Sequence, residues 1–155
     1  MIQRIQSLYL SLTTVLSLLF LRGSFLTFTD KSASGISLAF SGIYRGSSLQ
    51  GYELIEKLLP LSVLIICIPV LSIATIFIYK NRKIQLWLAS SLIILTVFLI
   101  IACVSYSWVI TKEYNVTIVP GLKMVIPVLL LIFAIQAYRS IKKDDLLVKS
   151  YDRLR

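Results

Sequence analysis

The sequence predicts an all-α membrane protein built as a four-helix transmembrane bundle, and three observations support this class. Of the 155 residues, 57% are hydrophobic and only 15% are charged, and the mean hydropathy of +0.88 is too high for a soluble globular domain. Four apolar runs are long enough to cross a bilayer, and the basic residues gather beside these runs. We therefore expect residues 1–155 to form a single four-span membrane domain.

The four apolar runs cover residues 5–21, 58–79, 84–110 and 118–138. At a rise of about 1.5 Å per residue, the first run reaches about 26 Å and the third about 40 Å, against a hydrocarbon core of about 30 Å. The first run therefore needs its flanking residues to complete a span, and the third needs to tilt to fit within the core. A cleaved signal peptide is the alternative for the first run, but residues 22–29 contain no suitable cleavage site, so we expect the run to be retained.

The basic connection at residues 80–83 predicts the orientation, because short loops rich in Lys and Arg remain in the cytoplasm. The two termini and the tail at residues 139–155 then lie on the cytoplasmic side, together with ten of the 16 basic residues. Aromatic residues mark the ends of the runs, as expected at a membrane interface. They are Tyr79, Trp87 and Tyr138 inside, and Phe20, Tyr106, Trp108 and Tyr114 outside.

The extracytoplasmic loop at residues 22–57 contains an alternation of apolar and small residues that is typical of a strand. A second alternation lies between the third and fourth runs, and the two could pair as a short hairpin-like cap. The alternating apolar residues are Ile36, Leu38 and Phe40, and Tyr114, Val116 and Ile118. Residues 49–59 instead predict an amphipathic helical turn, in which Glu53 and Lys57 have the spacing of an i,i+4 ion pair.

The residue types present favour a protein without catalytic chemistry. The sequence has no histidine, which excludes histidine-ligated haem or zinc and the Ser/His and Cys/His catalytic pairs. Cys67 and Cys103 lie within apolar runs, form no CxxC motif and are expected to pack as small hydrophobic residues. All seven acidic residues fall in predicted loops or tails. We therefore expect no enzyme activity, no cofactor and no catalytic or metal-binding residue.

Two prolines interrupt the second and fourth runs. Pro69 and Pro127 are expected to kink these helices, because each removes the donor for the carbonyl four residues earlier, that of Ile65 or Lys123. Lys123 is expected near the outer boundary, where its ammonium group can reach water. Kinked spans can line a binding groove, although proline is also common in membrane helices for packing reasons.

Three segments carry a family resemblance: residues 1–7 (MIQRIQS), 79–85 (YKNRKIQ) and 141–155 (IKKDDLLVKSYDRLR). The chain resembles, over its whole length, a Bacteroidota-type family of small four-span inner-membrane proteins that is classed only as a domain of unknown function. The resemblance implies a bacterial inner membrane and a tail of the Asp-Arg-Leu-Arg type, with Tyr151 as a departure where a smaller residue is expected. It implies no activity. All three segments face the cytoplasm in the predicted topology, which suggests a role in docking.

The tail is the predicted partner-binding surface, because residues 139–155 carry six basic and three acidic residues and mixed signs suit a protein surface better than a lipid surface. The expected partner-binding residues are Lys149, Tyr151, Asp152, Arg153, Leu154 and Arg155.

We expect a non-enzymatic accessory or scaffold subunit of a bacterial inner-membrane complex, in protein export or envelope biogenesis, for example. Its partners would be membrane lipids and other inner-membrane proteins or further copies of the chain, with no nucleic acid. Two alternatives remain open: a protein that handles lipids or small apolar ligands between kinked second and fourth spans, and a small oligomeric transporter.

Overall fold

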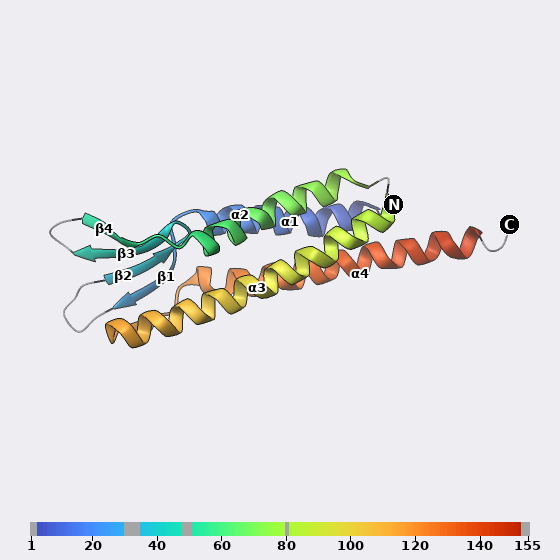
Figure 1. The fold of residues 1–155 in the computed structure, drawn as a ribbon. Coiled ribbons are helices and arrows are strands. Elements are labelled where there is room, and N and C mark those ends of the chain that lie inside the picture. Colours follow the sequence, from blue (N-terminus) through green and yellow to red (C-terminus); the bar gives the residue numbers. More distant parts are fainter. Residues whose placement is uncertain (1–2, 30–34, 48–50, 80, 153–155) are drawn as a thin grey trace.

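The computed structural model describes residues 3–29, 35–47, 51–79 and 81–152, and within them the fold is mostly helical with one small antiparallel sheet. Figure 1 shows the helices side by side, with the sheet at one end and both termini at the other. We call these the sheet end and the terminal end. The elements are α1 (Gln3–Leu21), β1 (Ser24–Thr29), β2 (Gly35–Ala39), β3 (Gly42–Ser47), β4 (Gly51–Glu56), α2 (Leu59–Phe77), α3 (Arg82–Tyr114), β5 (Thr117–Val119), the 3-10 helix η1 (Leu122–Val125) and α4 (Ile126–Asp152).

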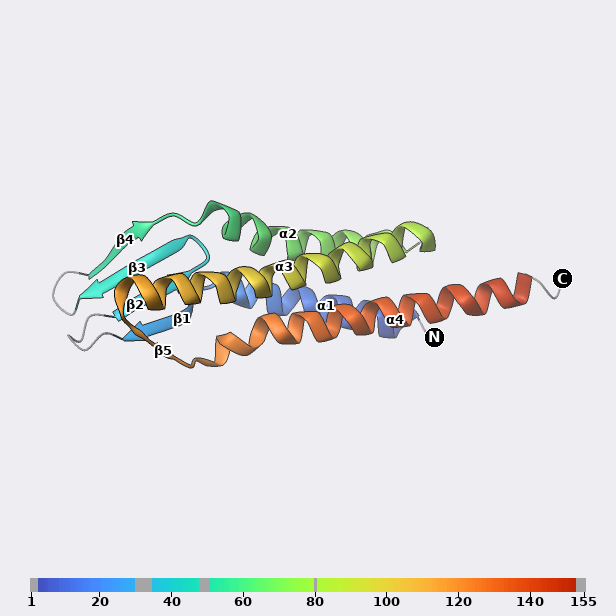
Figure 2. The ribbon, with the colours of Figure 1, turned by 60° about the horizontal axis from the view of Figure 1, so that its bottom comes forward.

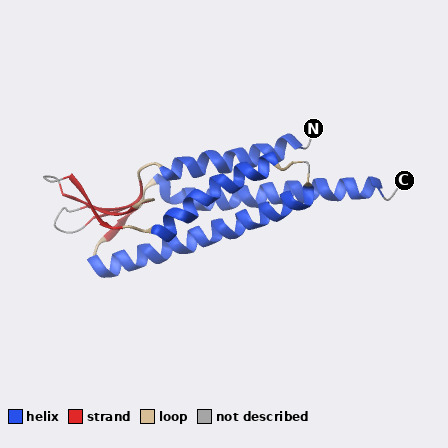
Figure 3. Cartoon of the chain, turned by 45° about the horizontal axis from the view of Figure 1, so that its top comes forward, coloured by secondary structure: helices blue, strands red, loops and turns tan. Residues whose placement is uncertain are grey.

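The four helices run alternately toward and away from the sheet, so that chain neighbours are antiparallel (Figure 3). α1 packs against α2 and α4, and α3 packs against the same two helices. Ala134 and Ala137 of α4 are fully buried, and such small side chains allow helix backbones to approach closely. The larger buried residues between the helices are Leu10, Leu61, Ile65, Ile68, Leu92, Leu99 and Leu130.

Polar side chains also join α1 to α2. The Ser72 hydroxyl donates to the Leu10 carbonyl oxygen at 2.9 Å, and the Thr14 hydroxyl donates to Ser72 Oγ at 3.1 Å. Ser72 is fully buried, so these bonds satisfy a hydroxyl that would otherwise be costly to bury.

The sheet has the strand order β4-β3-β2-β1-β5, with every neighbouring pair antiparallel. Leu26, Leu38 and Ile43 form one row across β1, β2 and β3, and all three are buried. The predicted alternation at Ile36 and Leu38 therefore forms a strand. Its partner was predicted wrongly, because Ile118 of β5 pairs with Phe28 of β1 rather than with β2. The sheet is also larger than the hairpin-like cap that was expected.

The junction between α1 and the sheet depends on two local irregularities. Gly23 has φ of +67°, a left-handed conformation that glycine adopts with little strain. A register shift between Ser24 and Leu26 then makes a bulge, which explains why the consecutive residues Phe25 and Leu26 are both buried. Phe20 is also almost fully buried, so the predicted role of this residue as a membrane-interface anchor is wrong.

The predicted helical turn at residues 49–59 is also wrong, since Gly51–Glu56 forms strand β4. Glu53 pairs with Arg45 across β3 and β4 rather than lying one helical turn from Lys57. A short helix here would leave the edge of β3 without a hydrogen-bonding partner, and pairing of that edge explains the strand.

The fourth helix begins later than its apolar run. Ile118 lies in β5, and α4 starts only at Ile126. Pro127 therefore occupies the first turn of α4, where proline is compatible with a straight helix, and the Lys123 carbonyl accepts a bond from the Ile126 N–H. The predicted kink at Pro127 is thus wrong, whereas Pro69 does lie inside α2. At its other end, α4 continues through most of the predicted tail to Asp152.

Candidate functional site

A group of polar side chains, three of them buried and Arg82 half-buried, lies between the helices at the terminal end. We call Gln6, Arg82, Gln85 and Asp144 the polar cluster. Gln6 and Gln85 are each 5% exposed and Asp144 is 7% exposed. The Gln6 side-chain amide donates to Asp144 Oδ2, Arg82 Nη1 donates to the Asp144 carbonyl oxygen at 2.8 Å, and Gln85 Nε2 donates to the Thr75 carbonyl oxygen at 3.3 Å.

These contacts connect all four helices, because Gln6 belongs to α1, Thr75 to α2, Arg82 and Gln85 to α3, and Asp144 to α4. Hydrogen bonds that involve a charged group are the stronger ones, and a buried group that loses its partner becomes costly. The polar cluster therefore fixes where α4 leaves the other helices.

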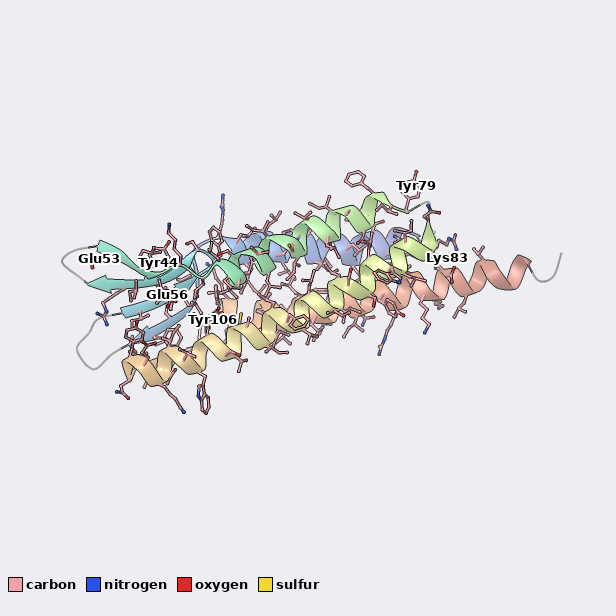
Figure 4. All side chains as sticks on the ribbon, in the orientation of Figure 1. Tyr44, Glu53, Glu56, Tyr79, Lys83 and Tyr106 are labelled. Atoms are coloured by element: carbon pink, nitrogen blue, oxygen red, sulfur yellow. The ribbon has the colours of Figure 1, made fainter. Side chains whose placement is uncertain are left out.

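A cavity of about 280 Å³ adjoins the polar cluster and is also lined by Ser7, Ile76, Phe77, Tyr79 and Ile141. Asp144 Oδ1 is buried and has no hydrogen-bond partner among the described residues. A cavity of this size has room for water molecules, which commonly satisfy such an oxygen. Figure 4 labels Tyr79 and Lys83 at this end, far from Tyr44, Glu53 and Glu56 at the sheet end.

The polar cluster brings together the three segments that carry the family resemblance: residues 1–7 supply Gln6, residues 79–85 supply Arg82 and Gln85, and residues 141–155 supply Asp144. The sequence reasoning missed this site: it assigned Asp144 to the cytoplasmic tail and did not anticipate that the side chain is buried against the other helices. The available signal was the presence of Gln6 and Gln85 within the first turn of apolar runs, where a side-chain amide can pair with a neighbouring helix.

The predicted partner-binding residues lie beyond the polar cluster, at the end of α4. Lys149, Tyr151 and Asp152 belong to the helix, but their side chains are outside the described part, and Arg153, Leu154 and Arg155 lie outside the described residues altogether. Figure 2 shows α4 extending past the ends of the other helices. We call residues 145–152 of α4 the projecting segment. Three of its aliphatic side chains, Leu146, Leu147 and Val148, have exposed fractions of 58%, 39% and 39%.

A second and larger cavity lies at the sheet end. This sheet-end cavity has a volume of about 570 Å³ and walls from the end of α1, β1, α3, β5, η1 and the start of α4. Its lining residues are Phe20, Phe25, Leu26, Ile100, Cys103, Val104, Ser107, Trp108, Thr111, Lys112, Ile118, Met124, Pro127 and Val128. Pro127 belongs to the wall but α2 supplies none of these residues, so the cavity differs from the groove expected between the second and fourth spans.

The remaining candidate residues have simple structural roles. Cys67 and Cys103 are both free and half-buried, as expected for cysteines that pack as small side chains. Lys123 lies in η1 and its ammonium group donates to the Arg22 carbonyl oxygen at 2.6 Å.

Comparison with protein families gives one match, to a domain of unknown function, DUF4293, which covers residues 2–154. No curated protein and no solved structure is similar to the chain. Among the residues that the structure describes, three helices are long and apolar enough to cross a membrane, and Ile5–Leu21 is a shorter apolar helix, which agrees with a membrane protein. Because the match covers nearly the whole chain, the protein belongs to the DUF4293 family.

Proposed function

We propose that the protein crosses a bacterial inner membrane four times, with both termini in the cytoplasm. The three long apolar helices support three of the spans, and the side-chain pattern of the shorter α1 supports the fourth. Its inward face carries the buried polar residues Gln6, Thr13 and Ser17, whereas its outward residues, apart from the exposed Ser7 and Ser11, are aliphatic and about half exposed. These outward residues are Ile5, Leu8, Val15, Leu18 and Leu19. A helix that buries its larger polar side chains and exposes mainly aliphatic ones suits lipid surroundings better than water.

Cysteine labelling tests the topology. In a variant without Cys67 and Cys103, cysteines introduced at Ser34 or Ser47 should react with an impermeant thiol reagent in intact cells, because both lie in the predicted outer loop. Cysteines at Asn81 or Ser150 should react only after the membrane is opened. Labelling of Asn81 in intact cells would overturn the orientation.

We further propose that the protein acts, without catalysis, as an accessory or scaffold subunit of a membrane complex, and that α4 docks on a protein partner. The observation that carries this proposal is the projection of α4 beyond a point where the polar cluster anchors it. Asp144 is held by α1 and α3, and α4 then continues for eight residues, or about 12 Å, to Asp152. An anchored helix needs little further ordering when it binds, which favours affinity.

The composition of the projecting segment favours a protein over a lipid surface. Its aliphatic residues Leu146, Leu147 and Val148 are exposed. Residues 149–155, which follow them in the sequence, carry charges of both signs. Anionic lipid attracts basic residues at about 1 kcal/mol each, but Asp145 and Asp152 would oppose that attraction. Mixed charges instead provide orientation and specificity at a protein interface.

Deletion of residues 148–155 tests this docking role. The truncated protein should insert and fold, because the polar cluster is retained, but it should lose the partner that copurifies with the full chain in mild detergent. The exchange of Asp152 and Arg153 (D152R together with R153D) should weaken the same association at unchanged net charge. The matched control exchanges the exposed residues Glu56 and Lys57 at the sheet end and should keep the partner. If the truncated protein keeps every partner, the docking proposal is wrong.

A further inference from the structure

We propose that the sheet-end cavity binds an acyl chain of an anionic phospholipid, with the lipid phosphate near Lys112. The sheet-end cavity lies at the opposite end of the helices from the projecting part of α4, and the proposal is independent of the docking site. It rests on the proposed membrane insertion but not on any partner of α4.

The size and shape of the sheet-end cavity suit a hydrocarbon chain. Its volume of about 570 Å³ is within the range of about 300–1,000 Å³ that is usual for small-ligand sites. The α3 wall runs from Ile100 to Lys112, and the twelve helical steps between these residues span about 18 Å. An elongated ligand can therefore lie along α3, with one end deep between the helices and the other end near the sheet.

The walls offer almost no polar partner to a ligand. Ser107 and Thr111 are the hydroxyl residues of the lining, and both donate within α3, to the carbonyl oxygens of Cys103 at 2.7 Å and Ser107 at 2.8 Å. The other lining residues apart from Lys112 are aromatic, aliphatic, sulfur-containing or proline. An apolar chain therefore leaves no buried donor unpaired, whereas a polar ligand would lose hydrogen bonds on entry.

Access and charge favour a lipid from the surrounding bilayer. Val104, Trp108 and Val128 line the cavity and remain 63%, 65% and 48% exposed, so the rim opens toward the outer surface of the helices. Lys112 stands at the end of the α3 wall, with its ammonium group 4.9 Å from the centroid of the Trp108 ring. Lys123 precedes the lining residue Met124 and contacts Arg22, which adds positive charge at the same end. Glu113 is exposed and is not part of the lining. An anionic headgroup complements this charge.

Quenching of Trp108 fluorescence by brominated lipids tests the inference. Trp87 is the other tryptophan, is 80% exposed and lies near the start of α3, so W87F leaves Trp108 as the single reporter. The protein is reconstituted in phosphatidylcholine vesicles that contain brominated phosphatidylglycerol or brominated phosphatidylcholine. We expect Trp108 to select the anionic lipid about fivefold, the preference that one lysine near the headgroup provides.

Two variants with matched controls separate a lipid in the cavity from general attraction to the protein surface. S107F fills the cavity and should remove most of the preference, whereas S105F should preserve it, because Ser105 makes the same type of bond within α3 but is not in the lining. K112Q should lower the ratio of binding between anionic and zwitterionic lipid toward one. K83Q, at the other end of α3, should leave this ratio unchanged.

Each alternative outcome overturns the inference. Equal quenching by both lipids would mean that Trp108 contacts only bulk lipid. A preference that survives S107F would mean surface attraction without an occupied cavity. Weak quenching by both lipids in a dimeric sample would mean that a second copy covers the site. Vesicle flotation is measured first, so that failure of membrane insertion is recognised separately from failure of lipid selection.

Discussion

The four helices pack differently at their two ends. At the terminal end, Gln6, Arg82, Gln85 and Asp144 meet between the helices and connect all four of them by hydrogen bonds. At the sheet end, a cavity of about 570 Å³ with mainly apolar walls lies beside α3 and the start of α4.

The comparison shows how membrane helices can combine a fixed end with an adaptable one. Hydrogen bonds are directional, so a buried polar group tolerates only a few arrangements of its neighbours. Apolar contacts impose no such direction, and in a bilayer a lipid chain can replace a side chain at little cost. A fixed terminal end suits the docking of α4, and an adaptable sheet end suits a lipid.

Removal of the Asp144 carboxylate is expected to have the largest effect. D144A leaves the Gln6 amide buried without its acceptor, which should lower the free energy of unfolding by about 2 kcal/mol. The corresponding fall in the unfolding temperature is about 4–8 °C, measured by tryptophan fluorescence in mild detergent. D144N should lose less, because its amide oxygen can still accept from Gln6. K142A, an exposed change on the same helix, is the control. Unfolding of D144A at the wild-type temperature would show that the polar cluster does not hold the terminal end together.

A smaller effect is expected at the sheet end from G23A. The left-handed conformation of Gly23 should cost alanine about 1 kcal/mol. The new Cβ would lie 3.3 Å from Lys123 Nζ, the flexible end of a side chain that can move aside. G121A is the matched control, since its Cβ would meet no atom within 4 Å. Equal unfolding temperatures for the two variants would contradict the assigned role of Gly23.

The smallest effect is expected from the two cysteines. C67A and C103A should each change the free energy of unfolding by less than about 1 kcal/mol, because both side chains are free and only half-buried. Neither variant should alter the phenotype that deletion of the gene produces. A gel shift that depends on oxidation and disappears in both single variants would instead indicate a disulfide.

Local composition predicted the helices well and their limits poorly. The long apolar runs and the alternation at Ile36 and Leu38 are signals within one segment, and both produced the expected element. The predicted start of the fourth helix was wrong because residues 117–119 form a strand that pairs with β1. The paired residues Thr29 and Thr117 are 88 positions apart in the sequence. Strand β4 was missed for the same reason, since its hydrogen bonds belong to β3 and not to its own segment.

The sequence by itself indicated a membrane protein: a chain with long apolar segments and basic flanks must satisfy its backbone hydrogen-bonding groups within helices if it enters a bilayer. Only the tertiary structure decided where the candidate sites are. Gln6 and Asp144 are separated by 138 positions, and nothing near either residue indicates that the two meet. The sheet-end cavity likewise exists because α3, β1 and η1 face one another across a space that no described side chain fills. Helix formation depends on neighbours within a few residues, whereas polar pairing and cavities depend on which helix faces meet.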